Sequence, residues 1–160
     1  MDQSELEPAS WTWGLALIAL TIAIHAMALA MMALATLRIR VTLESRSLDS
    51  RHLIPIVVGM IGAVGLLLAA LHGIEAAVWA AAYLWLRAVD TPFDAMLYSL
   101  DSMTTRGASG LTLQPHWRLM GALEAADGML LFGISTAFVF AMMQVYWPML
   151  SRRDRLRAAP

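Results

Sequence analysis

The sequence contains no cysteine and no lysine, and charged residues make up only 14% of its 160 residues. The lack of cysteine excludes a disulfide framework and a thiolate metal site. A formal net charge of -1 is not that of a general nucleic-acid-binding protein, so we expect no nucleic-acid partner. The motifs G-x-S-x-G, H-E-x-x-H and the P-loop are missing too. We therefore expect neither an enzyme nor a metal or cofactor site.

What the chain has instead is apolar sequence. Hydrophobic residues make up 59% of it, and its mean hydropathy is +0.65. Three long apolar segments cover residues 11–37, 53–87 and 117–147. The first would rise about 40 Å as a helix, enough to cross about 30 Å of hydrocarbon with some tilt. The sequence therefore predicts an all-α membrane protein with three transmembrane helices.

The arginines predict the orientation. Eight of the eleven basic residues lie in two segments, 38–52 and 148–160. By the positive-inside tendency, both segments face the cytoplasm and contact anionic lipid headgroups. Three spans then place the acidic N-terminal residues 1–10 and the region between the second and third spans outside. We expect a multi-pass protein of the bacterial cytoplasmic membrane, with its N-terminus outside and its C-terminus cytoplasmic.

A short helix is predicted in that outer region, within "DTPFDAMLYSLDSMTT". Thr91 is a good N-cap, Pro92 suits the first helical position, and Asp94 stands where a capping-box acid would. The helix should cover residues 92–103, and at about 18 Å it is too short to span the membrane. A half-helix that enters from outside and returns as an extended Thr/Gly strand is a re-entrant pore loop. The alternative is an ordinary extracellular hairpin.

The order of these segments resembles the pore module of tetrameric potassium channels, with one additional N-terminal helix at 11–37. The matching stretches are "LHGIEAAVWAAAYLWL", "YSLDSMTT", "HWRLMGALEAADG" and "GMLLFGISTAFVF". The resemblance implies a homotetramer with a channel-like pore domain at 53–147. It divides that domain into an outer helix at 53–87, a pore helix at 92–103, a filter-like loop at 104–110 and an inner helix at 117–147.

The filter-like loop departs from the pattern TVGYGD of that family. It consists of Thr104, Thr105, Arg106, Gly107, Ala108, Ser109 and Gly110, and from Thr105 onward four of the six family positions differ. A potassium filter replaces the hydration shell of the ion with rings of backbone carbonyls, which need a defined backbone. We therefore do not expect potassium selectivity by the usual mechanism, and either a monovalent cation or an anion remains open as the permeant ion.

Arg106 has two possible placements. Behind the filter, its guanidinium would pair with Asp101 or with Glu124, because either charge buried alone would be costly. Turned inward, four copies would form a ring that repels cations and favours anions or closes the path.

The resemblance also assigns residues of the inner helix. It places Gly128 at a hinge, Asp127 near the cavity top where a ring of carboxylates would hold cations, and a pore-facing stripe at Phe132, Thr136, Phe140 and Gln144. Phe132 and Phe140 would then form constrictions that gate by dewetting. The alternative is ordinary helix packing, with the glycines permitting close approach.

One polar pair lies within the second span. His72 and Glu75 are three residues apart, so they share a helix face and can bond to each other. The alternative is that they reach the pore helix or the neighbouring subunit. Haem ligation by His25 and His72 is not expected, because paired histidines on each of two facing helices are missing.

The segments and the resemblance together predict two alternative functions. The first is a tetrameric channel that conducts ions passively, weakly selective or gated. The second is a non-conducting relative that acts as a membrane scaffold or signalling protein.

Overall fold

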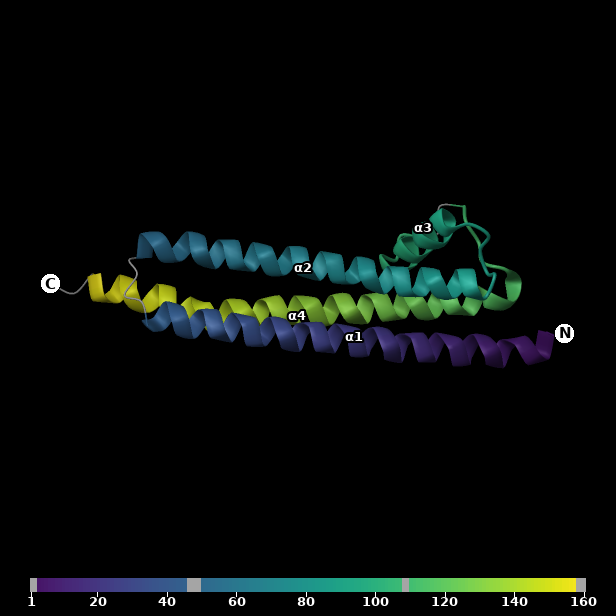
Figure 1. Cartoon of the computed structure of the whole chain (residues 1–160), viewed down its shortest axis with the longest axis horizontal. Coiled ribbons are helices and arrows are strands. Elements are labelled where there is room, and N and C mark those ends of the chain that lie inside the picture. The colour runs from purple at the N-terminus through teal and green to yellow at the C-terminus, as the bar shows by residue number, and fades with distance from the viewer. Residues whose placement is uncertain (1–2, 46–49, 108–109, 158–160) are drawn as a thin grey trace. The chain divides into compact units, whose positions relative to one another are not determined.

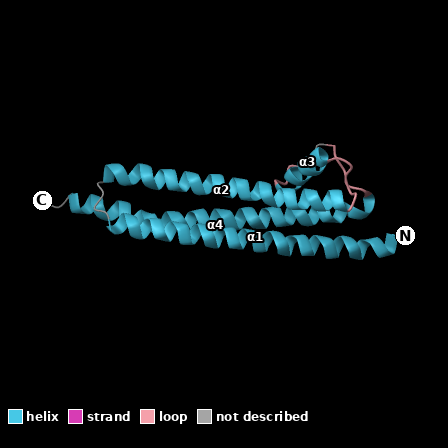
Figure 2. Cartoon of the chain, in the orientation of Figure 1, coloured by secondary structure: helices cyan, strands magenta, loops and turns pink. Residues whose placement is uncertain are grey.

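The structure is a computed structural model, and it describes residues 3–45, 50–107 and 110–157. These residues form helices and loops without a strand (Figure 2). The elements are α1 (Gln3–Ser45), α2 (Ser50–Trp85), α3 (Pro92–Met103), the 3-10 turn η1 (Pro115–Trp117) and α4 (Arg118–Arg157) (Figure 1). The predicted linker and tail are largely helical, since α1 runs on to Ser45, α2 begins at Ser50 and α4 continues to Arg157.

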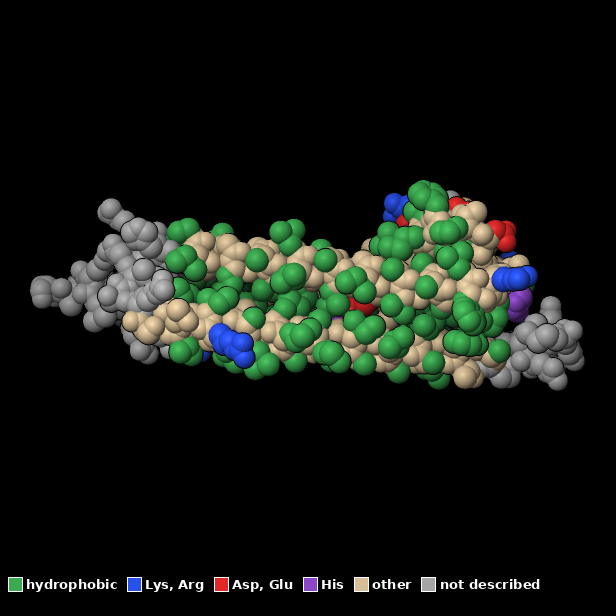
Figure 3. Space-filling model, in the orientation of Figure 1, with side chains coloured by type: hydrophobic (Ala, Val, Ile, Leu, Met, Phe, Trp, Pro, Cys, Tyr) green, Lys and Arg blue, Asp and Glu red, His purple; other side chains and the backbone are tan. Residues whose placement is uncertain are grey.

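Three of the helices are long and apolar enough to cross a membrane, as the sequence predicts. The apolar segments are Ala9–Leu43, Ile54–Trp85 and Pro115–Trp147, with hydropathies of 2.3, 2.5 and 1.8. Figure 3 shows hydrophobic side chains over much of the visible surface of α1 and α2. Leu66, for example, is 75% exposed. Side chains of this kind are stable on an outer surface when lipid rather than water surrounds it.

The chain divides into two compact units. The first comprises Met1–Ala26 and Ala70–Gly133, and the second comprises Met27–Ala69 and Ile134–Pro160. In the second unit, the hydroxyl of Tyr146 donates to the carbonyl of Thr36 at 2.7 Å, which joins α4 to α1. The first unit contains α3 and a hydrophobic core with three aromatic side chains. That core consists of Leu17, Trp79, Ala80, Tyr83, Ala88, Ala95, Leu113, Trp117 and Met120.

The start of α3 is determined locally. Thr91 has an extended backbone with φ -119° and ψ 148°. Its side-chain oxygen accepts from the backbone N–H of Asp94 at 3.1 Å, while its hydroxyl donates to the carboxylate of Asp94 at 2.8 Å. Pro92 occupies the first turn, where its missing N–H costs nothing. A helix is thus present over the residues for which the sequence predicts one.

The end of α3 is a Schellman motif. The backbone N–H of Arg106 donates to the carbonyl of Asp101 at 3.0 Å, and that of Thr105 donates to the carbonyl of Ser102 at 3.0 Å. Thr105 takes the left-handed position of this motif, with φ 56°, which glycine usually occupies. The extended strand expected from Thr104 onward therefore does not begin there, because the chain first closes this turn. Gly107 and Gly110 also have positive φ, at 79° and 84°.

Candidate functional site

The site is built where α3 packs against α2 and α4 within the first unit. The hydroxyl of Ser99 lies 2.8 Å from the carbonyl of Ala76 in α2 and also contacts the carboxyl group of Glu124 in α4. These contacts join three helices through one small polar side chain. Figure 1 shows α3 beside the ends of α2 and α4 that the loops connect.

Two glycines of α4 permit this close approach. A Cβ atom at Gly121 would stand 2.1 Å from the hydroxyl oxygen of Tyr98, and one at Gly128 would stand 2.4 Å from the backbone oxygen of Met103. Gly121 and Gly128 are seven residues apart, so they lie on the same face of α4, two turns apart. The resemblance assigns Gly128 a hinge, and the structure places it against the end of α3.

Arg106 pairs with Asp101. Its Nε lies 2.9 Å from Asp101 Oδ1, and its Nη2 lies 3.3 Å from Oδ2. The Asp101 side chain is 6% exposed, whereas that of Arg106 is 65% exposed. Of the two placements that the sequence leaves open, this single chain has the ion pair. Glu124, the other candidate partner of the guanidinium, is bonded elsewhere.

Glu124 is completely buried and accepts a hydrogen bond from the hydroxyl of Tyr83 at 2.6 Å, in addition to its contact with Ser99. Tyr83 packs edge to face on Tyr98, with ring centroids 5.4 Å apart. Burial raises the pKa of the Tyr98 phenol above its usual value. The phenol therefore keeps its proton to a higher pH than a free tyrosine does.

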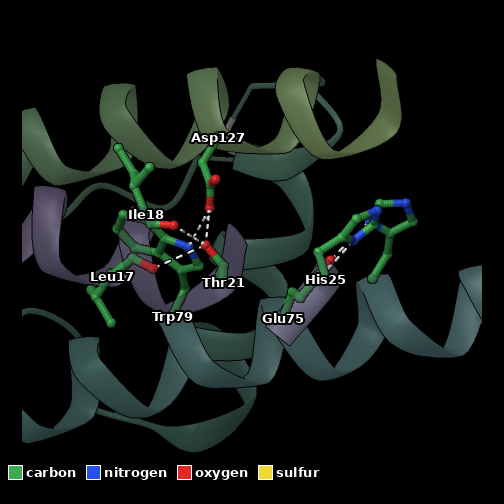
Figure 4. Close-up of polar contacts among 8 residues, drawn as sticks. Leu17, Ile18, Thr21, His25, Glu75, Trp79 and Asp127 are labelled. Carbon is green, nitrogen blue, oxygen red and sulfur yellow. Dashed lines mark hydrogen bonds and ion pairs between the residues drawn. The ribbon is translucent and has the colours of Figure 1, made fainter. Parts of the chain in front are cut away.

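Asp127, which the resemblance assigns to the top of a cavity, contacts α1 and α2 within the first unit. Its Oδ2 lies 2.7 Å from the hydroxyl of Thr21 in α1 and accepts from the indole N–H of Trp79 in α2 at 3.1 Å (Figure 4). It is 1% exposed. Its other oxygen, Oδ1, has no hydrogen-bond partner among the described residues. Asp127 thus points toward α1 and α2 and joins the three long helices, rather than lining an open face.

The expected pore-facing stripe is uncovered in the single chain. In the first unit, Phe132 is 42% exposed and lines a hollow of about 380 Å³ together with Met103, Thr104, Thr105 and Met129. Thr136, Phe140 and Gln144 belong to the second unit and are exposed there. Of the filter-like loop, Ala108 and Ser109 lie outside the described residues, while Thr104 to Gly107 and Gly110 are exposed.

The polar pair of α2 is present and has a third member that the sequence analysis missed. His72 Nδ1 lies 3.1 Å from one oxygen of Glu75, and His25 Nδ1 of α1 lies 2.8 Å from the other. Helical spacing could reveal the first contact but not the second, because His25 and Glu75 are fifty residues apart in sequence. The only signal was a lone histidine in an otherwise uncharged span.

Comparison with protein-family models, with curated proteins and with solved structures finds no match to this chain.

Proposed function

We propose that this chain forms a pore-loop ion channel, assembled as a homotetramer around the face of the first unit that carries α3, Met129 and Phe132. Passive ion conduction, weakly selective or gated, is the activity. The permeant ion is a monovalent cation or an anion. The membrane is the bacterial cytoplasmic membrane, with the arginine-rich segments on the cytoplasmic side.

The observation that carries this proposal is the contact of Met103 with Gly128. Gly128 lies ten residues into α4, about 15 Å along the helix from its start at Arg118. With the start of α4 at the outer headgroups, the end of α3 lies about half the thickness of the hydrocarbon deep, and the chain then returns to Pro115 in η1, just before α4. A segment that enters and leaves on the same side is re-entrant. Irregular backbone at that depth is tolerated only where protein or a water-filled cavity surrounds it.

The surroundings of the α3 end support a cavity. Thr104 and Thr105 are exposed beside Met129 and Phe132, so polar groups and apolar side chains line one hollow. In a lone chain, the polar turn at Thr104 and Thr105 would face lipid across this hollow. Each backbone polar group left without a hydrogen bond there would cost several kcal/mol. Further copies of the same face around an axis would enclose the hollow with protein and water.

The Arg106–Asp101 pair favours conduction over a blocked pore. Two contacts of 2.9 and 3.3 Å offset the positive charge of Arg106 locally, so a ring of four such pairs carries no large net charge. Such a ring therefore needs neither an unusually wide pore nor bound anions to limit the repulsion between its arginines.

The first test measures oligomeric state and ion flux. The protein, purified in detergent, is examined by native mass spectrometry and then reconstituted into liposomes for separate flux assays of K⁺, Na⁺ and Cl⁻. We expect a tetramer and flux of at least one of these ions. A monomer or dimer overturns the assembly, and a tetramer that conducts none of the ions favours the scaffold or signalling function.

The absence of native cysteine permits a second, sharper test. In Met129→Cys, the new thiol lies in the hollow, whereas in Leu66→Cys it lies on an apolar surface of α2, and both positions are well exposed at 60% and 75%. A charged methanethiosulfonate reagent should reduce flux through Met129→Cys and leave flux through Leu66→Cys unchanged. Equal effects on both variants would show that the hollow does not line the conduction path.

A further inference from the structure

The buried cluster of His25, His72 and Glu75 has no part in the proposed conduction path. It lies within the first unit, where α1 supplies His25 and α2 supplies the other two residues. Each residue offers one donor atom, and these atoms lie within 4.8 Å of one another. Figure 4 shows His25 and Glu75 directed toward each other across the two helices.

The three side chains of this cluster are largely buried. Glu75 is completely buried, His25 is 1% exposed, and the side chain of His72 is 12% exposed. An ionisable group inside an apolar helix of this length is costly and usually marks a functional site. Each oxygen of Glu75 lies near a different imidazole nitrogen, at 2.8 and 3.1 Å, so the carboxylate stands between the two histidines.

We propose that His25, His72 and Glu75 bind a divalent transition-metal ion, for which Zn²⁺ is the best fit. Two imidazoles and one carboxylate with a fourth position open form a known zinc donor set. Magnesium and calcium are poor candidates, since both prefer oxygen ligands throughout. Metal–ligand distances of about 2.0 to 2.2 Å separate tetrahedral donor atoms by about 3.4 Å. The two contacts of Glu75, at 2.8 and 3.1 Å, are shorter than that separation, and all three donor atoms lie within 4.8 Å of one another, so no donor pair has to change its separation by more than about 1.4 Å. The ion replaces the hydrogen bond that now joins His25 to Glu75.

The surrounding structure fixes the donors. Helical geometry sets the spacing of His72 and Glu75, and the imidazole of His72 stacks on the ring of Phe132, with centroids 4.1 Å apart and an interplanar angle of 19°. Rigid helices and a packed ring are the supports that a precise metal site requires. His72 is the most exposed of the three residues, and Phe132 lines the hollow, so this side is the route of entry.

The test uses Co²⁺ as a spectroscopic probe and Zn²⁺ as its competitor. The purified full chain is treated with a chelator, dialysed and titrated with Co²⁺ in detergent. We expect one Co²⁺ per chain, with a visible ligand-field band that Zn²⁺ abolishes. His72→Gln and Glu75→Gln should each weaken Co²⁺ binding by at least about tenfold, since even residues that only support a metal ligand contribute that much.

His116→Gln is the matched control. His116 lies in η1, and the contact that Ser10 makes there is with its backbone oxygen, which the substitution retains. This variant should bind Co²⁺ as the wild type does, and Zn²⁺ should raise its Tm but not that of Glu75→Gln. No band in the wild type, or equal affinity in His72→Gln, overturns the proposal.

A measurement on the wild type alone covers the case in which the variants do not fold. Electron paramagnetic resonance of the Cu²⁺-loaded protein should show coupling to two nitrogen nuclei, and a spectrum without nitrogen coupling overturns the site. None of these measurements requires ion flux or a tetramer. A failure of the metal proposal is therefore distinguishable from a failure of the channel proposal.

Discussion

The contact between Gly128 and Met103 makes a quantitative prediction for Gly128→Ala. The new Cβ would stand 2.4 Å from the oxygen of Met103 and 2.7 Å from its Cα, both of which are backbone atoms. An ordinary contact requires about 3.4 Å, so the end of α3 must retreat by about 1 Å. Overpacking of this kind costs typically about 1–3 kcal/mol.

Gly133→Ala in the same helix is the control, because a Cβ there meets nothing within 4 Å in the chain. Both substitutions gain the same helix propensity, about 1 kcal/mol. The difference between the two unfolding free energies therefore isolates the clash, and Gly128→Ala should be the less stable variant by about 1–3 kcal/mol. This difference in unfolding free energy is measured by tryptophan fluorescence during unfolding in mixed detergent micelles. If Gly128→Ala proves as stable as Gly133→Ala, α3 does not end against α4 and the argument for a re-entrant segment fails with it.

Three further substitutions test the neighbourhood of α3 by the same unfolding measurement and by flux. Thr105→Gly should stabilise the protein by about 1 kcal/mol, because the left-handed backbone conformation at this position is strained for a residue with a Cβ and not for glycine. Any loss of stability contradicts the Schellman motif. Arg106→Ala should lower the unfolding free energy by about 1–3 kcal/mol, because the exposed guanidinium itself contributes little but the Asp101 carboxylate, 6% exposed, loses this partner. It should also leave ion flux nearly unchanged, and a large rise in cation flux would show an inward-facing ring instead of the pair with Asp101. Tyr83→Phe should cost about 1–3 kcal/mol by leaving buried Glu124 without that donor, and a neutral result would mean that the hydrogen bond contributes nothing.

Much of the fold could be predicted from the sequence because its signals are local. Long apolar runs are sufficient to identify three helices of membrane-spanning length. Thr91, Pro92 and Asp94 mark the beginning of α3 through contacts that lie within three residues of one another. The pair of His72 and Glu75 also follows from helical spacing alone.

The remainder depends on contacts between helices that sequence spacing does not contain. Periodicity indicates which face of α4 carries Asp127, but not that Thr21 and Trp79 cover this face. The sequence around His25 does not indicate its partner, because Glu75 belongs to another helix. The Schellman turn was missed because Thr105 occupies a position that local preference reserves for glycine.

The buried acids of α4 bear on how this protein reaches its membrane. An aspartate near the middle of a helix opposes its insertion by about 2.5 to 3.5 kcal/mol, and α4 carries both Glu124 and Asp127. Their hydrogen-bond donors are Thr21 of α1, Trp79 and Tyr83 of α2, and Ser99 of α3, all of which the ribosome synthesises before α4. α4 would therefore enter the bilayer beside segments that already hold the groups it needs, and deletion of α1 should impair biogenesis even though it leaves every residue of the proposed pore in place.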